Sequence, residues 1–287
     1  MMASEDTSSD RKVSFFASDL CVSDGTDIGT DETASQVAEA SGVFNLDTSE
    51  ITYSQNIYEK IYPASTTKIL TAYVAIKNGD LSQTITVSEN AVNQASDSSV
   101  CGLKAGDVMT LEQLLYGMML KSGNDAAVAI AEGISGDVES FANLMNETAA
   151  SLGATNTHYV NPNGLHDDDH YTTVYDMYLI FQAALNDSTF ETIVTSSAYT
   201  VNYTDASGTE QTMDWTTTNR YLLGTETVPS GVTILGGKTG TTNPAGYCLV
   251  LYSKNESNQK IVSIVMKADC RSNLYYYMNQ LLYMFAN

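Results

Sequence analysis

Basic residues are scarce in this chain of 287 residues: 13 Lys and Arg stand against 34 Asp and Glu, and the formal net charge is −21. Proteins that bind nucleic acids neutralise phosphates with clustered Lys and Arg, and the sequence has no basic run. The same shortage excludes an anionic membrane surface as a charge-driven partner. We therefore expect no nucleic acid and no acidic lipid among the partners of this protein.

Long hydrophobic runs are also missing, since no stretch reaches the roughly 18 to 20 apolar residues that a membrane-spanning helix needs. Residues 1–12 lack the apolar centre of a signal peptide. The sequence therefore predicts no membrane anchor in these residues. It leaves two locations open, the cytoplasm or the exterior after removal of a leader.

Cysteine pairs are absent, because none of the four cysteines has a C-x-x-C neighbour; they are Cys21, Cys101, Cys248 and Cys270. This spacing argues against a zinc knuckle and against a thioredoxin-like redox pair. We expect buried free thiols instead.

The chain has 43% hydrophobic and 16% charged residues, which is enough apolar material for a full core. That material is unevenly distributed. Residues 1–34 are rich in Asp, Ser, Thr and Gly and predict a loosely ordered tail or linker. Residues 35–287 carry regular patterns and predict one folded domain.

Strand patterns occur at both ends of this domain. Alternating residues predict a β-hairpin over 42–54, and three β-rich runs predict strands over 232–240, 247–253 and 260–267. Helical patterns lie between these ends, and a final helix is predicted over about 273–285. The fold class is therefore α+β, with an antiparallel sheet built from N- and C-terminal strands, packed against helices and interrupted by a mostly helical middle region.

Three helices of the middle region matter for the chemistry. One is buried, starts near Ser65 and stops at Asn78-Gly79. A second opens with a capping box of Thr110 and Gln113, and a break at Ser122-Gly123-Asn124 separates it from a third.

Three short motifs occur in order along the chain: Ser65-Thr66-Thr67-Lys68, Ser122-Gly123-Asn124 and Lys238-Thr239-Gly240. They have the form S-x-x-K, S-x-N and K-T-G. Each pattern alone is weak, and S-x-x-K recurs at Ser9 and Ser257, but only Ser65 stands at the start of a buried helix.

The first motif predicts an activated serine. Residues three apart on a helix share a face, so the amine of Lys68 can reach the hydroxyl of Ser65. A serine hydroxyl is a poor nucleophile at neutral pH and needs such a base. Burial and a second nearby cation such as Lys238 would hold Lys68 neutral enough to accept a proton.

The other two motifs predict the walls of a cleft. Ser122 and Asn124 lie in a break between helices, where a hydroxyl can relay a proton to a leaving nitrogen. Lys238 and Thr239 end a strand, and Gly240 allows an extended substrate to approach the backbone.

Longer blocks around these motifs make the chain similar to the low-molecular-mass penicillin-binding proteins, the serine-type D-alanyl-D-alanine carboxypeptidases. The resemblance runs from about Ser41 to Phe285. Its blocks are residues 63–71, 120–127, 161–166, 237–241 and 245–250.

The resemblance implies a role for each motif residue. Ser65 is then the nucleophile, Lys68 its general base, and Ser122 with Asn124 the proton-relay and orienting pair. Lys238 supplies positive potential. The resemblance further implies substrate contacts, in which Thr239 helps to hold the terminal carboxylate, Gly240 lies along the substrate, and the N–H groups of Ser65 and Thr241 form the oxyanion hole.

The reaction so implied is release of the terminal D-alanine of a peptidoglycan stem peptide through a Ser65 acyl-enzyme, with β-lactams as covalent inhibitors. No cofactor is implied. The resemblance also implies an extracytoplasmic enzyme, in the cell envelope or secreted, whose leader is absent from this chain.

The sequence departs from the family at the substrate carboxylate. Many relatives have an Arg just before the aromatic residue that starts the last helix, where this chain has Asn273-Leu274-Tyr275. Arg271 and Arg220 are the candidate replacements. Many relatives also continue into a second, β-rich domain.

Other functions remain open. A DD-endopeptidase shares the same motifs, and so does a serine β-lactamase, although no Glu occurs between Glu147 and Glu191 to activate a deacylating water. A non-catalytic penicillin-sensing or wall-binding module would lose Ser65 or Lys68, and both are present.

The segment His166-Asp167-Asp168-Asp169-His170, with His158 nearby, concentrates possible metal ligands. Because Asn161-Pro162-Asn163-Gly164 precedes it, the segment predicts a solvated polar loop, and no metal site is expected. The run Tyr275-Tyr276-Tyr277 predicts core and interface aromatics.

Overall fold

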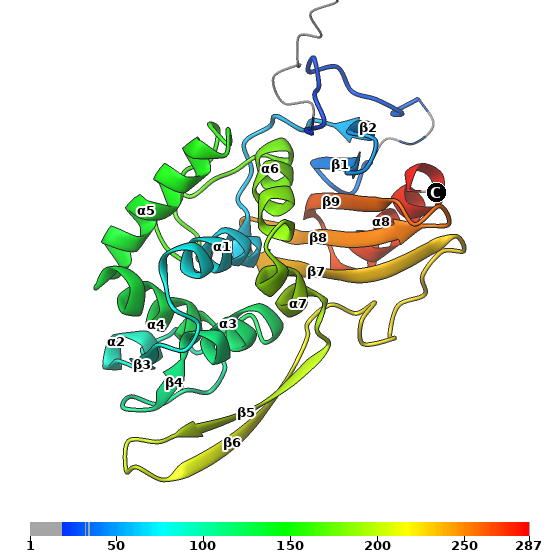
Figure 1. The fold of residues 1–287 in the computed structure, drawn as a ribbon. Coiled ribbons are helices and arrows are strands. Elements are labelled where there is room, and N and C mark those ends of the chain that lie inside the picture. Colours follow the sequence, from blue (N-terminus) through cyan, green and yellow to red (C-terminus); the bar gives the residue numbers. More distant parts are fainter. Residues whose placement is uncertain (1–18, 32, 34, 287) are drawn as a thin grey trace, which may run out of the picture.

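The computed structural model describes residues 19–31, 33 and 35–286, and its centre is a five-stranded antiparallel sheet (Figure 1). Strands from both ends of the chain lie in it in the order β2-β1-β9-β8-β7. Their bounds are Ala40–Asn45 (β1), Glu50–Gln55 (β2), Val232–Thr242 (β7), Gly246–Asn255 (β8) and Lys260–Ala268 (β9). The predicted α+β class, the hairpin and the three C-terminal strands are confirmed.

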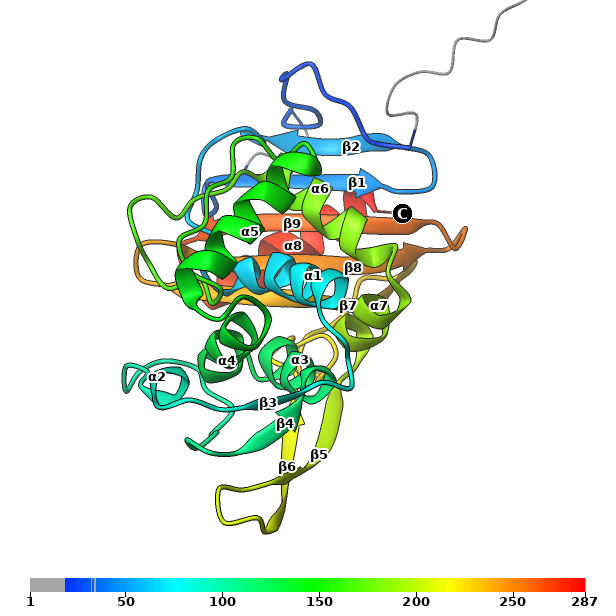
Figure 2. The same cartoon turned by 60° about the vertical axis from the view of Figure 1, so that its left-hand side comes forward.

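Both faces of this sheet are covered by helices. The bounds of the helical elements are Ala64–Thr67 (η1, a 3₁₀ turn), Lys68–Asn78 (α1), Glu89–Val92 (α2), Leu111–Leu120 (α3), Asn124–Ser135 (α4), Val138–Ser151 (α5), Val174–Leu185 (α6), Ser188–Thr195 (α7) and Arg271–Phe285 (α8). Figure 2 shows α8 behind the sheet and the helices of the middle region in front of it.

Successive side chains of a strand point to opposite faces, so each central strand contributes to two cores. In β1, Val43 packs in the cluster under α8, whereas Phe44 packs among the helices of the other face. In β8, Leu251 packs in the cluster under α8, and Val250 packs among the helices of the other face. Burial on both faces explains why these strands are nearly continuous hydrophobic runs.

A second, smaller sheet was not predicted from the sequence. It has the order β3-β4-β5-β6, and its strands are Thr84–Thr86 (β3), Val108–Thr110 (β4), Ala198–Thr204 (β5) and Glu210–Thr216 (β6). The hairpin of β5 and β6 projects from the body of the molecule (Figure 1). Only its inward residues, such as Val201 and Trp215, are buried, and the many exposed polar residues between them conceal the alternation in the sequence.

Two helix ends that the sequence predicted are found in the structure, the start of α3 and the end of α1. The capping box is present: Thr110 Oγ1 accepts the N–H of Gln113, and the Gln113 side chain accepts the N–H of Thr110. Gly79 does follow α1, but its φ is −113°, so it is not a left-handed cap. A Cβ at Gly79 would lie 2.5 Å from side-chain atoms of Ile134 and Leu111, so close helix packing explains this glycine.

Residues 19–31 are not a loose tail. Cys21 is fully buried, its N–H donates to the Tyr178 phenol at 2.8 Å, and Ile28 forms a bridge with Ser54. The domain boundary predicted at residue 34 stays a prediction. Residues 1–18, 32 and 34 of the predicted tail lie outside the described residues. In the part of the chain that the structure describes, none of the helices combines the length and the apolar character needed to cross a bilayer.

Candidate active site

The 3₁₀ turn η1 brings Ser65 to the edge of a cleft. Thr66 and Thr67 of this turn are buried, whereas Ser65 is partly exposed and lines the cleft. The turn is fastened locally, because the Thr66 hydroxyl donates to the Pro63 carbonyl at 2.7 Å. Ala64 has a φ of +48°, a left-handed conformation that costs energy for a residue with a Cβ, directly before the predicted nucleophile.

Lys68, the first residue of α1, is completely buried beneath Ser65. Its Nζ lies 3.0 Å from Ser65 Oγ, 2.8 Å from Asn124 Oδ1 and 2.7 Å from the Asn163 carbonyl oxygen. Burial lowers the pKa of Lys68 well below its usual value of 10.5, and the charge of Lys238 lowers it further.

A neutral Lys68 fits these three neighbours. The amine then has two N–H groups and one lone pair. The oxygens of Asn124 and Asn163 only accept hydrogen bonds, so they take the two N–H groups. The lone pair is left for the Ser65 hydroxyl, which can donate its proton. The structure therefore places the Lys68 amine beside the Ser65 hydroxyl, as the spacing predicted.

Ser122 and Lys238 form a second hydroxyl–amine pair across the cleft. Ser122 lies between α3 and α4 with a φ of +59°, outside either helix. Lys238 Nζ, on β7, donates to Ser122 Oγ at 2.9 Å and to the Thr239 carbonyl at 2.8 Å. Burial lowers the pKa of Lys238 to about 7.

Strand β7 runs directly against the serine turn at Gly240. A Cβ at Gly240 would lie 2.9 Å from the backbone nitrogen of Ser65 and 2.9 Å from the Pro63 carbonyl oxygen. The sequence predicted that this glycine admits a substrate backbone, and the structure adds a second reason, the approach of β7 to η1. On either side, Thr239 Oγ1 lies 2.6 Å from Thr218 Oγ1, and Thr241 lines the cleft.

The cleft has a volume of about 520 Å³. Around it the structure brings together residues of all three motifs and both candidate arginines. Its lining residues are Ser65, Ser99, Ser122, Thr218, Arg220, Leu223, Thr225, Thr239, Gly240, Thr241, Tyr247, Cys248, Arg271, Leu274 and Tyr275. No Asp or Glu is among these described residues, although the chain carries a net charge of −21. The cleft is therefore suited to an anionic ligand.

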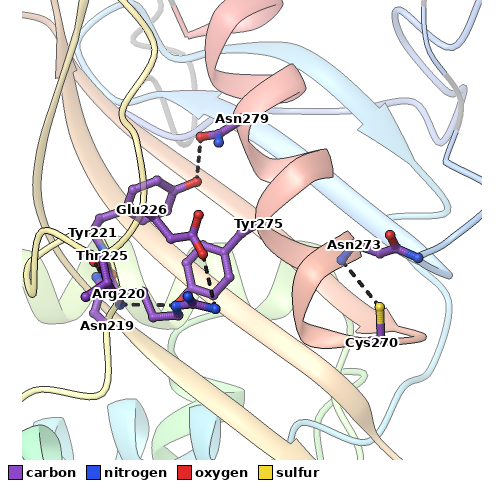
Figure 3. A network of polar contacts seen from close by, with 9 residues as sticks. All are labelled: Asn219, Arg220, Tyr221, Thr225, Glu226, Cys270, Asn273, Tyr275 and Asn279. Carbon is purple, nitrogen blue, oxygen red and sulfur yellow. Dashed lines mark hydrogen bonds and ion pairs between the residues drawn. The ribbon is translucent and has the colours of Figure 1, made fainter.

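Figure 3 shows the surroundings of Arg220. Its Nη1 lies 3.2 Å from Glu226 Oε1, and its backbone N–H donates to the Tyr275 phenol at 3.2 Å. The sequence indicated no role for Glu226 and did not predict Tyr275 as a cleft residue. The aromatic run that contains Tyr275 was predicted as core and interface, which holds for the buried Tyr275 and Tyr277, whereas Tyr276 is 64% exposed and Tyr275 also lines the cleft.

Asp125 is a second residue that the sequence did not single out. It is 1% exposed, and its carboxylate accepts the N–H groups of Cys101, Gly102, Leu103 and Ala126 at 2.8 to 3.1 Å. The same loop accepts the N–H of Asn124 at the Ser99 carbonyl, 2.8 Å away. Asp125 thus holds the Ser99 wall of the cleft against the second motif.

The histidine-rich segment contacts its own loop and the turn η1. His170 is 2% exposed, so the prediction of a solvated loop is wrong for this residue, while His166 and the three aspartates are exposed. His170 Nε2 lies 2.8 Å from Thr67 Oγ1, and the Val160 N–H donates to its Nδ1. No metal-ligating group of three His, Cys, Asp or Glu side chains exists within the described ranges.

The four cysteines are free thiols. Cys21, Cys101 and Cys248 are buried, as predicted, and Cys270 is only partly buried because it caps the start of α8. Burial raises the pKa of Cys248 to about 12, which makes that thiol unreactive at neutral pH.

Comparison with known proteins places the chain among sequences of one family. Residues 29–270 match the profile of a family described as D-alanyl-D-alanine carboxypeptidase. D-alanyl-D-alanine carboxypeptidase DacF of Bacillus subtilis is 33% identical over 238 residues, and the D-alanyl-D-alanine carboxypeptidase of Streptomyces sp. K15 is 37% identical over 213 residues. These alignments cover 80% and 70% of this chain, and 57% and 71% of the two relatives. The chain therefore spans little more than half the length of the first relative.

A solved structure gives the same result for the fold. The crystal structure of the Streptomyces K15 DD-transpeptidase superposes with a TM-score of 0.77 at 31% identity, covering 86% of this chain and 97% of that one.

Proposed function

The chain belongs to the D-alanyl-D-alanine carboxypeptidase family, and on this premise we propose that it removes the terminal D-alanine of peptidoglycan stem peptides through an acyl-enzyme on Ser65. The observation that carries the proposal is the 3.0 Å contact between the buried Lys68 amine and the Ser65 hydroxyl at the wall of the cleft. An unactivated serine has no need of a buried lysine, which is costly to desolvate.

In the first step, the Ser65 oxygen attacks the carbonyl carbon of the penultimate D-alanine, and Lys68 takes the hydroxyl proton. The oxygen of the tetrahedral intermediate then lies at the N–H groups of Ser65 and Thr241. Loss of one such donor typically costs about 100- to 1,000-fold in rate. We expect both N–H groups to contribute to acylation.

In the second step, the bond between carbon and the nitrogen of the terminal D-alanine breaks, and that nitrogen receives a proton. The pair of Ser122 and Lys238 supplies it, because the two side chains are in contact at 2.9 Å and Lys238 has a pKa of about 7. The proton that Lys68 took from Ser65 then replaces the one given up, so both amines return to their starting states. Such an amine can both give and take a proton near neutral pH. Asn124 orients the substrate and holds Lys68.

The terminal carboxylate is held at the other end of the cleft, by Thr239 and by an arginine, with Gly240 against the peptide backbone. The cleft favours an anion because it contains two arginines and no acid among its described lining residues. Water then attacks the acyl carbon of the Ser65 ester. Its hydroxide joins that carbon, Lys68 takes the remaining water proton and passes it to the Ser65 oxygen, and the shortened peptide leaves.

Peptidoglycan lies outside the cytoplasm, so this substrate assigns the protein to the cell envelope or the exterior. β-Lactams are expected to acylate Ser65 as substrate mimics. Transfer of the acyl group to an amine is the second candidate reaction, since the superposed K15 structure carries the name DD-transpeptidase.

The test is release of D-alanine from a diacetylated Lys-D-Ala-D-Ala tripeptide, compared with release from a cross-linked muropeptide. We expect the tripeptide to be the better substrate and Ser65→Ala to be inactive, with the folding of that variant checked by circular dichroism. Faster cleavage of the muropeptide would assign a DD-endopeptidase, and product appearing only with an added amine acceptor would assign a transpeptidase.

Turnover of nitrocefin distinguishes the proposed carboxypeptidase from a serine β-lactamase. A trapped acyl-enzyme gives about one turnover per molecule, whereas a β-lactamase gives many. No carboxylate that could activate a deacylating water lines the described cleft, so we expect slow release.

A further inference from the structure

The two arginines of the cleft differ in how their charge is balanced. Arg220 is half-buried on the loop that follows β6, and Arg271 is an exposed residue at the first position of α8. Both line the cleft that contains Ser65. Which of them is free to bind a carboxylate depends on what each already contacts.

Arg220 already has a carboxylate partner. Its Nη1 lies 3.2 Å from Glu226 Oε1, and its guanidinium lies 5.5 Å from the centre of the Tyr275 ring. The backbone turns between Arg220 and Glu226 and so places the two side chains close together. In this turn the Arg220 carbonyl accepts the N–H groups of Thr225 at 2.9 Å and of Glu226 at 3.3 Å. Arg220 and Glu226 therefore form a closed ion pair within one turn of chain (Figure 3).

This turn is fixed to α8, the helix that also carries Arg271. The Tyr221 hydroxyl donates to Asn279 at 2.8 Å, and the Tyr221 and Tyr275 rings meet edge to face with centres 5.2 Å apart. Burial raises the pKa of Tyr275, while Arg220 and Arg271 both act to lower it, so this phenol lies within range of both cations.

Arg271 has no such partner in the described part of the chain. Its guanidinium lies 5.9 Å from the centre of the Tyr247 ring, and none of the ion pairs includes it. The acid two residues before it, Asp269, accepts both of its hydrogen bonds from the Asn273 amide, at 2.9 and 3.1 Å. The charge of Arg271 thus remains available to a ligand.

We propose that Glu226 is a specificity-determining residue: by pairing with Arg220 it leaves Arg271 as the guanidinium that binds the ligand carboxylate, so that the cleft selects a peptide end with a single negative charge. The inference rests on the proposed function. Without Glu226, two free guanidinium groups would face the same cleft, and a ligand with two terminal carboxylates would be favoured.

The experiment measures binding in the Ser65→Ala background, where no bond is broken. Calorimetry compares diacetyl-Lys-D-Ala-D-Ala, its C-terminal amide, and the analogue ending in D-glutamate. We expect the acid to bind about tenfold or more tightly than the amide, since a charge-assisted hydrogen bond is lost in the amide. Arg271→Gln should abolish this preference, and Arg220→Gln should keep most of it.

The decisive variants carry Glu226→Gln. Added to Arg271→Gln, it should restore a preference for the acid by freeing Arg220, and alone it should improve binding of the D-glutamate analogue at least severalfold. Glu191→Gln is the matched control, because it removes an acid paired with Lys260 outside the cleft lining and should change neither ratio. Thermal melts verify that each variant is folded.

The inference is overturned if Arg220→Gln abolishes the preference as fully as Arg271→Gln does, if Glu226→Gln restores nothing, or if acid and amide bind equally. D-Alanine release by the wild type is measured separately and decides the proposed function. An active wild type with the wrong binding ratios contradicts only the role of Glu226, and an inactive wild type with the expected ratios contradicts only the peptidase activity.

Discussion

At the scale of single residues, the central feature is that two lysines are buried where each touches a hydroxyl group. Burying an ammonium is unfavourable, so both Lys68 and Lys238 have lowered pKa values. In the proposed mechanism, this unfavourable burial is what makes them useful as bases near neutral pH. Stability and activity therefore oppose each other at these two positions.

Lys238→Met tests this opposition through the pH dependence of stability. The pKa of Lys238 falls from 10.5 in the unfolded chain to about 7 in the fold. Between these values the unfolded chain binds the proton and the folded chain does not, so the wild type loses stability as pH falls from 10.5 to 7. The largest slope from one group is about 1.4 kcal/mol per pH unit.

The free energy of unfolding of Lys238→Met, measured in urea, should lack this contribution. Its stability relative to the wild type should therefore rise as pH falls from 10.5 to 7 and stay constant below 7, while acylation of Ser65 drops about 100-fold or more. A relative stability independent of pH over this window would contradict the assignment. Lys254→Met, at a partly exposed position of β8, is the control.

At the scale of elements, the loop between α5 and α6 contacts η1 and α1, the elements that carry Ser65 and Lys68. The Asn163 carbonyl accepts from Lys68, the Pro162 carbonyl accepts from Thr71 at 2.6 Å, and His170 contacts Thr67. A Cβ at Gly164 would lie only 1.9 Å from the Ala64 carbonyl oxygen, so the loop is packed tightly against η1. Two hydrogen bonds to α1 and one to η1 thus tie this loop to the elements that carry Lys68 and Ser65.

His170 has a defined protonation state in this contact. The Val160 N–H donates to Nδ1, so Nε2 carries the proton and donates to Thr67 Oγ1. Burial lowers the pKa of His170 to about 3, and the imidazole stays neutral at all working pH values. It is a positioning residue, because it acts through Thr67 and does not line the cleft.

We expect His170→Ala to slow β-lactam acylation about 10- to 100-fold, because the turn carrying Ser65 and Lys68 loses its lateral support and reacting groups tolerate little displacement. The acylation rate should show the same pH profile as the wild type, since His170 does not titrate there. His170→Gln retains an N–H donor and should recover part of the rate. The exposed His166→Ala should have no effect, and a shifted pH profile in His170→Ala would contradict a positioning role.

At the scale of the whole molecule, an acidic protein surrounds a cleft whose described lining carries only positive charge. Salt screens distant charges within about 10 Å at 0.1 M, so the arginines that line the cleft dominate the potential that a ligand meets there. The fold makes this separation by bringing β7, η1, the break between α3 and α4 and the start of α8 to one place.

Much of this arrangement could be predicted from the sequence. The spacing of Ser65 and Lys68 on a helix, the break at Ser122 and the strand ending in Lys238 each left a local signal. The groups that support these residues left no such local signal in the sequence. The Asn163 carbonyl is a backbone atom, Asp125 binds N–H groups of a loop more than twenty residues away in sequence, and the burial of His170 inside an acidic loop results from tertiary packing.

The division of charge between Arg220 and Arg271 could not be predicted for the same reason. It depends on Glu226, six residues after Arg220, folding back onto it, and only the hydrogen bonds of the intervening turn reveal this.

The central claim is that Ser65 is an activated nucleophile, and intact-mass spectrometry after incubation with benzylpenicillin tests it most directly. The account predicts one covalent adduct per chain with the mass of the whole inhibitor, on the peptide that contains Ser65, and none in Ser65→Ala. A wild-type protein that stays unmodified, or an adduct that persists in Ser65→Ala, would contradict it.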